Sequence, residues 1–193
     1  MPRWVPNLIS AVRIGLIPTF VFVAYQGRQA VEQGADSAGA RIVPLAVLLA
    51  IGLSDLLDGW IARKYGLESQ AGAILDALAD KLAQISILAF LALAGGAPFA
   101  VLPLWLLAVV VGRDVLLGGG WSLSVLMARP IRVVHRPHGR IASTLVFALL
   151  LFATAGASPP LVWGLTMVVV VTVIASTVQY LRDGLERYRR PGL

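Results

Sequence analysis

Four aspartates are concentrated in one apolar stretch of the chain: Asp55, Asp58, Asp76 and Asp80. Within each pair the residues are three or four positions apart, so both members lie on the same face of a helix. A carboxylate at membrane depth costs about 3 kcal/mol or more, which disfavours isolated charges there. Two facing helices that each carry such a pair would instead form an oxygen-lined site suited to a hard divalent cation.

The residues around the aspartates are suited to phosphate chemistry. Gly59 and Gly72 leave space where the two helices meet or where a ligand approaches the backbone, and Arg63 and Lys64 can bind an anion. A cation beside basic side chains neutralises a phosphate leaving group, while a spare carboxylate deprotonates an attacking hydroxyl. This combination predicts chemistry on a pyrophosphate at a membrane surface.

The composition places the chain in a membrane. Of its 193 residues 58% are hydrophobic and only 13% are charged, whereas a soluble domain carries about 25% charged residues. We expect one membrane domain spanning residues 1–193. The net charge of +6 does not indicate nucleic-acid binding, because the basic residues are not gathered on a soluble face and fit anionic lipid headgroups better. The absence of cysteine excludes disulfides, thiolate metal sites and a cysteine nucleophile.

The hydropathy pattern predicts an all-α integral membrane protein with six transmembrane helices. A short interfacial helix over Met1–Ile9 is expected to precede them, and Arg28–Ala40 is the one polar linker. The expected spans are Leu8–Gln26, Arg41–Ala62, Ala71–Ala94, Pro98–Met127, Ile141–Gly156 and Pro160–Leu181.

The basic residues predict the orientation of these spans. Eleven Lys and Arg residues fall on one side of the predicted topology, and only Arg28 and Arg41 fall on the other. By the positive-inside rule both termini are cytoplasmic, and the aspartates lie near the cytoplasmic face. We expect this membrane to be a bacterial inner membrane.

The pattern D-x2-D-G-x2-A-R-x8-G-x3-D-x3-D is complete over Asp55–Asp80 and resembles the signature of the CDP-alcohol phosphatidyltransferase family. The resemblance implies attack of an acceptor hydroxyl on the lipid-bearing phosphorus of CDP-diacylglycerol, with release of CMP, by a homodimer. The four aspartates would hold two Mg²⁺ or Mn²⁺ ions, with Asp80 as general base. The residues implied to bind the CDP-lipid are Asp55, Asp58, Gly59, Ala62 and Gly72, together with Arg63 on its phosphates.

The acceptor is less well defined by the sequence. The stretches Asp76–Lys81 and Pro6–Arg13 resemble the glycerol-phosphate and cardiolipin branches, whereas Arg113-Asp114 resembles the cardiolipin type. Lys81, Arg113 and Arg140 would form a cationic pocket for an acceptor phosphate; alternatively, Arg113 pairs with Asp114. We favour glycerol 3-phosphate as the acceptor, with phosphatidylglycerol as the alternative.

Other hypotheses remain open. The aspartates could form the ion path of a small cation or proton transporter, but Ile42–Gly52 and Leu82–Ala94 offer almost no polar continuation. A non-catalytic scaffold would bind CDP-lipid without turnover, and purely structural ion pairs would not require the fixed glycines. Asn7 and Arg13 could reach phosphates, cap a helix or extend to the interface. His135 and His138 fit a solvated inner loop.

Overall fold

The computed structural model describes residues 5–65, 70–126 and 137–189. In these residues all regular secondary structure is helical, which confirms the predicted all-α class. The helices are α1 (Val5–Glu32), α2 (Ser37–Tyr65), α3 (Gln70–Leu93), α4 (Leu104–Leu126), α5 (Pro137–Thr154) and α6 (Pro159–Arg189).

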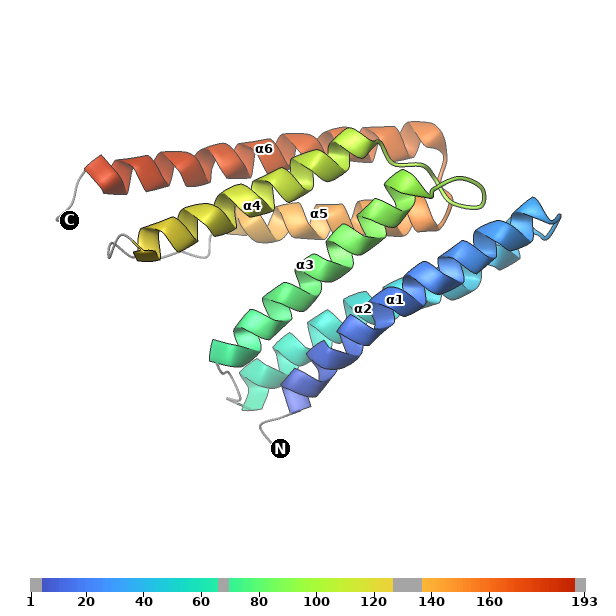
Figure 1. Cartoon of the computed structure of the whole chain (residues 1–193), viewed down its shortest axis with the longest axis horizontal. Coiled ribbons are helices and arrows are strands. Elements are labelled where there is room, and N and C mark those ends of the chain that lie inside the picture. Colours follow the sequence, from blue (N-terminus) through green and yellow to red (C-terminus); the bar gives the residue numbers. More distant parts are fainter. Residues whose placement is uncertain (1–4, 66–69, 127–136, 190–193) are drawn as a thin grey trace.

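The helices form two groups of three (Figure 1). In the first group α1 packs against both α2 and α3, and in the second α6 packs against α5 and α4. Contacts of α3 with α4 and α5, and of α2 with α5, join the groups. Successive helices run in opposite directions, and the α1–α2, α3–α4 and α5–α6 connections all lie on the right of Figure 1. The start of α1 (bottom, near the middle) and the end of α6 (far left) both lie away from these connections. We call the side of these two helix ends the inner end and the side of the three connections the outer end.

The apolar core lies mainly in the outer half of the molecule. Its largest fully buried side chains include Phe20, Leu48, Leu88, Leu106 and Leu149, one from each of the first five helices. Toward the inner end several buried apolar residues are alanines, such as Ala79, Ala83 and Ala142. Small side chains bury little surface, so apolar packing holds the inner ends less firmly than the outer ones.

Arg28 and Arg41, the two arginines predicted for the outer side, both donate hydrogen bonds to backbone carbonyls of the outer connections. Arg28 Nη1 donates to Ala94 O at 2.8 Å, while Arg41 donates from Nε to Pro98 O at 2.7 Å and from Nη1 to Ala155 O at 3.1 Å. Ala94 and Ala155 directly follow α3 and α5, where a cation is favourable next to the helix dipole. Arg28 and Arg41 therefore stabilise the connections at the outer end.

Some predicted boundaries were wrong. Val5–Ile9 already belong to α1, so this stretch is not a separate interfacial helix; residues 1–4 lie outside the described part of the chain. The expected linker shrinks to residues 33–36, because the ion pair of Arg28 with Glu32 (2.9 Å) extends α1. Asp36 then caps α2 by accepting the Gly39 N–H at 2.8 Å.

The fourth predicted span also begins later than expected. Residues 98–103 form an irregular segment before α4, with Pro98 and Pro103 at its ends and Leu102 buried in the core. Proline lacks the amide hydrogen that a continuous helix needs, so α4 begins only at Leu104. Trp105 follows directly and lies 6.1 Å from Trp163 between ring centroids, so the two rings meet near the starts of α4 and α6.

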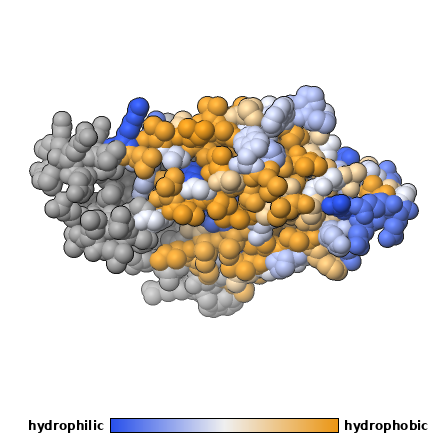
Figure 2. Space-filling model, turned by 45° about the horizontal axis from the view of Figure 1, so that its top comes forward, coloured by the Kyte–Doolittle hydropathy of each residue, from blue (hydrophilic) through white to orange (hydrophobic). Residues whose placement is uncertain are grey.

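Three helical stretches in the described residues are long and apolar enough to cross a membrane: Leu8–Glu32, Ser37–Leu57 and Pro159–Arg182. Ile141–Thr154 is apolar but shorter. Figure 2 shows apolar side chains over most of the visible middle of the molecule, as expected for a surface in contact with lipid. The number of six spans and their orientation stay predictions.

One close contact between α2 and α5 leads to a stability prediction. A Cβ on Gly52 would overlap with the ring of Phe147 at Cζ, and Phe147 packs against the core. Gly52→Ala should therefore destabilise the protein by about 1–3 kcal/mol, as measured by thermal unfolding in detergent.

The matched control is Gly15→Ala on α1, where no described atom of another part of the chain lies within 4 Å of the added Cβ. Alanine is the better helix former by about 1 kcal/mol, so this variant should be neutral or slightly stabilised. Equal loss of stability in both variants would contradict the proposed α2–α5 contact.

Candidate active site

Arg13 joins two of the predicted site aspartates. Its side chain is only 1% exposed, and Nη1 lies 2.8 Å from Asp76 Oδ1 and 3.1 Å from Asp55 Oδ1. Nε donates to Ser54 Oγ at 3.2 Å, and that hydroxyl donates to Ile51 O at 2.7 Å. The guanidinium is thus held from two sides, and α1 links the carboxylates of α2 and α3.

Asp80 belongs to the same electrostatic environment. It is partly buried on α3 and close enough to Asp55, Asp76 and Arg13 to interact with their charges. When ionised, the three carboxylates carry −3, of which Arg13 offsets one charge. Lys81 also acts on Asp80 and offsets a second charge, so the described side chains leave a net charge of −1 at this position, which attracts a divalent cation.

The donor set fits a hard cation. It consists of carboxylate oxygens, the ligands that Mg²⁺ and Mn²⁺ prefer, and Asp55 and Asp76 remain 44% and 40% exposed, so a ligand can approach them. Among the described side chains no three acidic or histidine residues are grouped closely enough to hold a metal ion as they stand. Arg13 lies between two of the carboxylates instead.

Several predicted donor-site residues are placed only by their backbone. Asp58, Gly59, Ala62 and Arg63 lie in the inner part of α2, and Gly72 lies in the first turn of α3. The side chains of Asp58, Ala62 and Arg63 are outside the described part of the chain. Their roles stay predictions.

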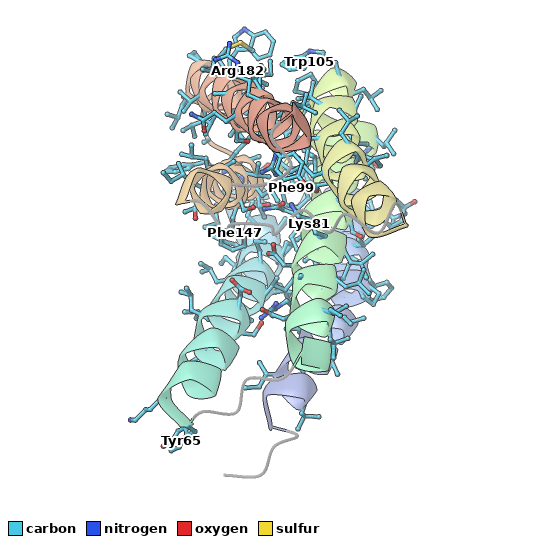
Figure 3. All side chains as sticks on the ribbon, turned by 90° about the vertical axis from the view of Figure 1, so that its left-hand side faces the viewer. Tyr65, Lys81, Phe99, Trp105, Phe147 and Arg182 are labelled. Carbon is cyan, nitrogen blue, oxygen red and sulfur yellow. The ribbon has the colours of Figure 1, made fainter. Side chains whose placement is uncertain are left out.

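The predicted acceptor residues Lys81 and Arg113 meet at a third residue, Asp114. Lys81 Nζ lies 3.0 Å from Asp114 Oδ2, and Arg113 Nη1 lies 3.3 Å from Asp114 Oδ1. Arg113 is 10% exposed, and its buried Nε has no hydrogen-bond partner among the described residues. In Figure 3, which looks from the inner end, Lys81 lies between the two groups of helices. We call Lys81, Arg113 and Asp114 the α3–α4 charge cluster.

The remaining predicted residues are Arg140, Asn7, His135, His138 and Lys64. The side chains of Arg140, Asn7 and His138, and the whole of His135, lie outside the described residues. Lys64 is exposed, with Nζ 5.8 Å from the centroid of the Tyr65 ring.

Arg13 and Asp114 have ion-pair partners that the sequence analysis did not identify. Arg13 was assigned only to phosphates, capping or the interface, although a cation inside an apolar segment usually has a carboxylate partner. That signal was available, but it could not identify Asp55 and Asp76, which are 42 and 63 positions away in the sequence. Asp114 was considered only as a partner of Arg113, because its contact with Lys81 depends on the packing of α3 against α4.

Comparison with known proteins gives one family. The sequence profile of the CDP-alcohol phosphatidyltransferases matches residues 3–179. A Mycobacterium tuberculosis (strain H37Rv) protein, whose name assigns it provisionally as a cardiolipin synthase, is 34% identical over 68% of this chain and 57% of its own length. A cardiolipin synthase (CMP-forming) of Streptomyces coelicolor is 28% identical over 88% of this chain and 82% of its own.

A third relative carries a different name. The CDP-diacylglycerol–glycerol-3-phosphate 3-phosphatidyltransferase of Bacillus subtilis is 34% identical over 56% of this chain and 55% of its own length. The matches thus span little more than half the length of the mycobacterial and Bacillus relatives. Relatives that carry two different enzyme names are therefore similar to the chain.

The α3–α4 charge cluster yields a prediction on stability. Lys81→Met and Asp114→Asn each remove one member of the ion pair, so their effects on unfolding should not add in the double variant. Because Lys81 is 32% exposed, solvent weakens the pair, and we expect a coupling energy of about 1 kcal/mol. Thermal or denaturant unfolding of the four proteins measures it, and strict additivity would contradict the contact.

Proposed function

Since this chain belongs to the CDP-alcohol phosphatidyltransferase family, we propose that it transfers the phosphatidyl group of CDP-diacylglycerol to the hydroxyl of a phosphate-bearing alcohol. The observation that carries this proposal is the convergence of Asp55 and Asp76 on Arg13, with Asp80 close by. These residues come from three helices and include three of the four aspartates of the family pattern.

In the proposed reaction a bond forms between the acceptor oxygen and the lipid-bearing phosphorus. The bond from that phosphorus to CMP breaks, and CMP leaves with the bonding electron pair. Asp80 accepts the proton of the acceptor hydroxyl as general base. Asp55, Asp58 and Asp76 would hold divalent metal together with Asp80, and the metal would neutralise charge on the pyrophosphate. Gly59, Ala62 and Gly72 would frame the nucleotide, and Arg63 would bind its phosphates.

The α3–α4 charge cluster supports an acceptor that carries a phosphate. Lys81 and Arg113 offer two cations at the boundary between the groups of helices, and the free Nε of Arg113 provides an unused donor. Arg140 would be the third cation. We propose glycerol 3-phosphate as the acceptor.

Phosphatidylglycerol is the second candidate, and Asp114 is the observation that favours it. By pairing with Lys81 and Arg113, Asp114 reduces the net charge of this cluster to +1. A single positive charge matches the monoanionic phosphodiester of a lipid better than the nearly dianionic phosphate of glycerol 3-phosphate. The transporter alternative is set aside, because the family match extends over most of the chain.

The proposal also includes the setting of the reaction. We propose that all six helices cross a bacterial inner membrane, with the aspartates near its cytoplasmic face and two chains in a homodimer. The shared inner end of α1 and α6 supports an even number of crossings, and the positive-inside bias gives the orientation.

Release of CMP from CDP-diacylglycerol tests the activity and its acceptor. Purified protein with Mg²⁺ should release CMP with glycerol 3-phosphate and much less with phosphatidylglycerol; the reverse preference would establish the second candidate. EDTA should abolish release, and excess Mg²⁺ or Mn²⁺ should restore it. No CMP with any phosphate-bearing acceptor would contradict the proposed function.

Replacing Asp80 with Asn tests the assignment of the base. The amide keeps the shape of the side chain but cannot accept the proton, so CMP release should fall by about 10²-fold or more, while binding of CDP changes little. Binding is measured by isothermal titration. Asp36→Asn is the matched control, because Asp36 only caps α2 at the outer end. Normal turnover of Asp80→Asn would show that another group is the base.

A further inference from the structure

The Arg13 guanidinium bridges two carboxylates, as a bound cation would. A single nitrogen, Nη1, lies within 3.1 Å of carboxylate oxygens from two different helices. The Arg13 side chain is almost completely buried, and Ser54 restricts its rotation through Nε. Only Oδ1 of each aspartate takes part in these two ion pairs.

The helices that carry the carboxylates contact each other little and are held together mainly through α1. Contacts between α2 and α3 are sparse compared with those that each makes with α1. The buried residues nearest the carboxylates on α3 are small, such as Ala79 and Ala83. Two carboxylates approaching each other in a membrane repel strongly, so a positive charge between them stabilises this arrangement.

We propose that Arg13 is a positioning residue that takes the place of the metal in the metal-free protein. It holds Asp55 and Asp76 facing each other until the divalent cation arrives, and the cation then takes over much of this stabilisation. This inference rests on the proposed function, in which the aspartates bind metal, and assigns a role to a residue outside the aspartate pattern.

The proposal predicts a specific coupling between Arg13 and metal. Arg13→Met should lower the melting temperature of the metal-free protein by about 5 °C, because the repulsion between Asp55 and Asp76 is then uncompensated. Saturating Mn²⁺ should recover most of this loss, so the rise in melting temperature on adding Mn²⁺ should be at least twofold larger in Arg13→Met than in the unsubstituted protein.

Arg28→Met is the matched control. Arg28 lies on the same helix and also forms an ion pair and a hydrogen bond to a carbonyl, but at the outer end. Its replacement should lower the melting temperature while the Mn²⁺-induced rise stays equal to that of the unsubstituted protein. Both measurements are made on the full chain in detergent, without substrate.

A metal titration and a second variant complete the test. Electron paramagnetic resonance of free Mn²⁺ during titration should show that Arg13→Met binds the metal with higher affinity than the unsubstituted protein, because a larger stabilisation by a ligand requires tighter binding to the folded state. If Arg13→Met cannot be purified without metal, Arg13→Gln replaces it, because glutamine also removes the charge but remains polar. The Mn²⁺-induced rise of Arg13→Gln should likewise exceed that of the unsubstituted protein.

Three results would overturn the role of Arg13. An unchanged Mn²⁺-induced rise in Arg13→Met, or in Arg13→Gln if only that variant folds, would make Arg13 a purely structural residue. Tenfold weaker Mn²⁺ binding would make it part of the metal site. Unchanged metal binding with tenfold weaker CDP binding would make it a phosphate ligand. Failure of the unsubstituted protein to bind Mn²⁺ would instead contradict the metal dependence in the proposed function.

Discussion

The inner end of this protein depends on one buried arginine between two carboxylates. Asp55 and Asp76 belong to helices that contact each other little, and Arg13 on α1 is the group that joins them. A buried charge is costly unless it is paired and hydrogen-bonded. Arg13 meets this condition with two carboxylates and one hydroxyl. The positions of the proposed metal ligands therefore depend on a residue of α1 as much as on the helices that carry them.

The two halves of the molecule are stabilised differently. In the outer half, large side chains such as Phe20, Leu88 and Leu149 form the core, and Arg28 and Arg41 fasten the connections. In the inner half, ion pairs replace much of this packing. Apolar packing excludes polar ligands, whereas an ion-paired region can exchange its internal partners for a ligand of the same charge. A site for charged substrates is therefore compatible with the inner half.

The inner half contains two neighbouring charge clusters of opposite sign. The carboxylates around Arg13 have a net negative charge and suit a divalent cation, while Lys81, Arg113 and Asp114 have a net positive charge and suit an anion. Asp80 and Lys81 are adjacent on α3, so the proposed base and the proposed acceptor site lie next to each other. This adjacency fits a direct transfer between a metal-bound donor and an anionic acceptor, in which the base must reach the acceptor hydroxyl.

The sequence alone determined the all-helical class, the six helices of the described residues and the convergence of α2 and α3 carboxylates on one end, because hydropathy and residue spacing are local properties. It did not determine the break before Leu104 or the length of α1, which depend on prolines and on one ion pair. Only the tertiary structure decided that Arg13 lies between Asp55 and Asp76 and that Lys81 meets Asp114. The physical reason is that a buried charge requires a partner, while helix packing selects which of several distant partners comes within reach.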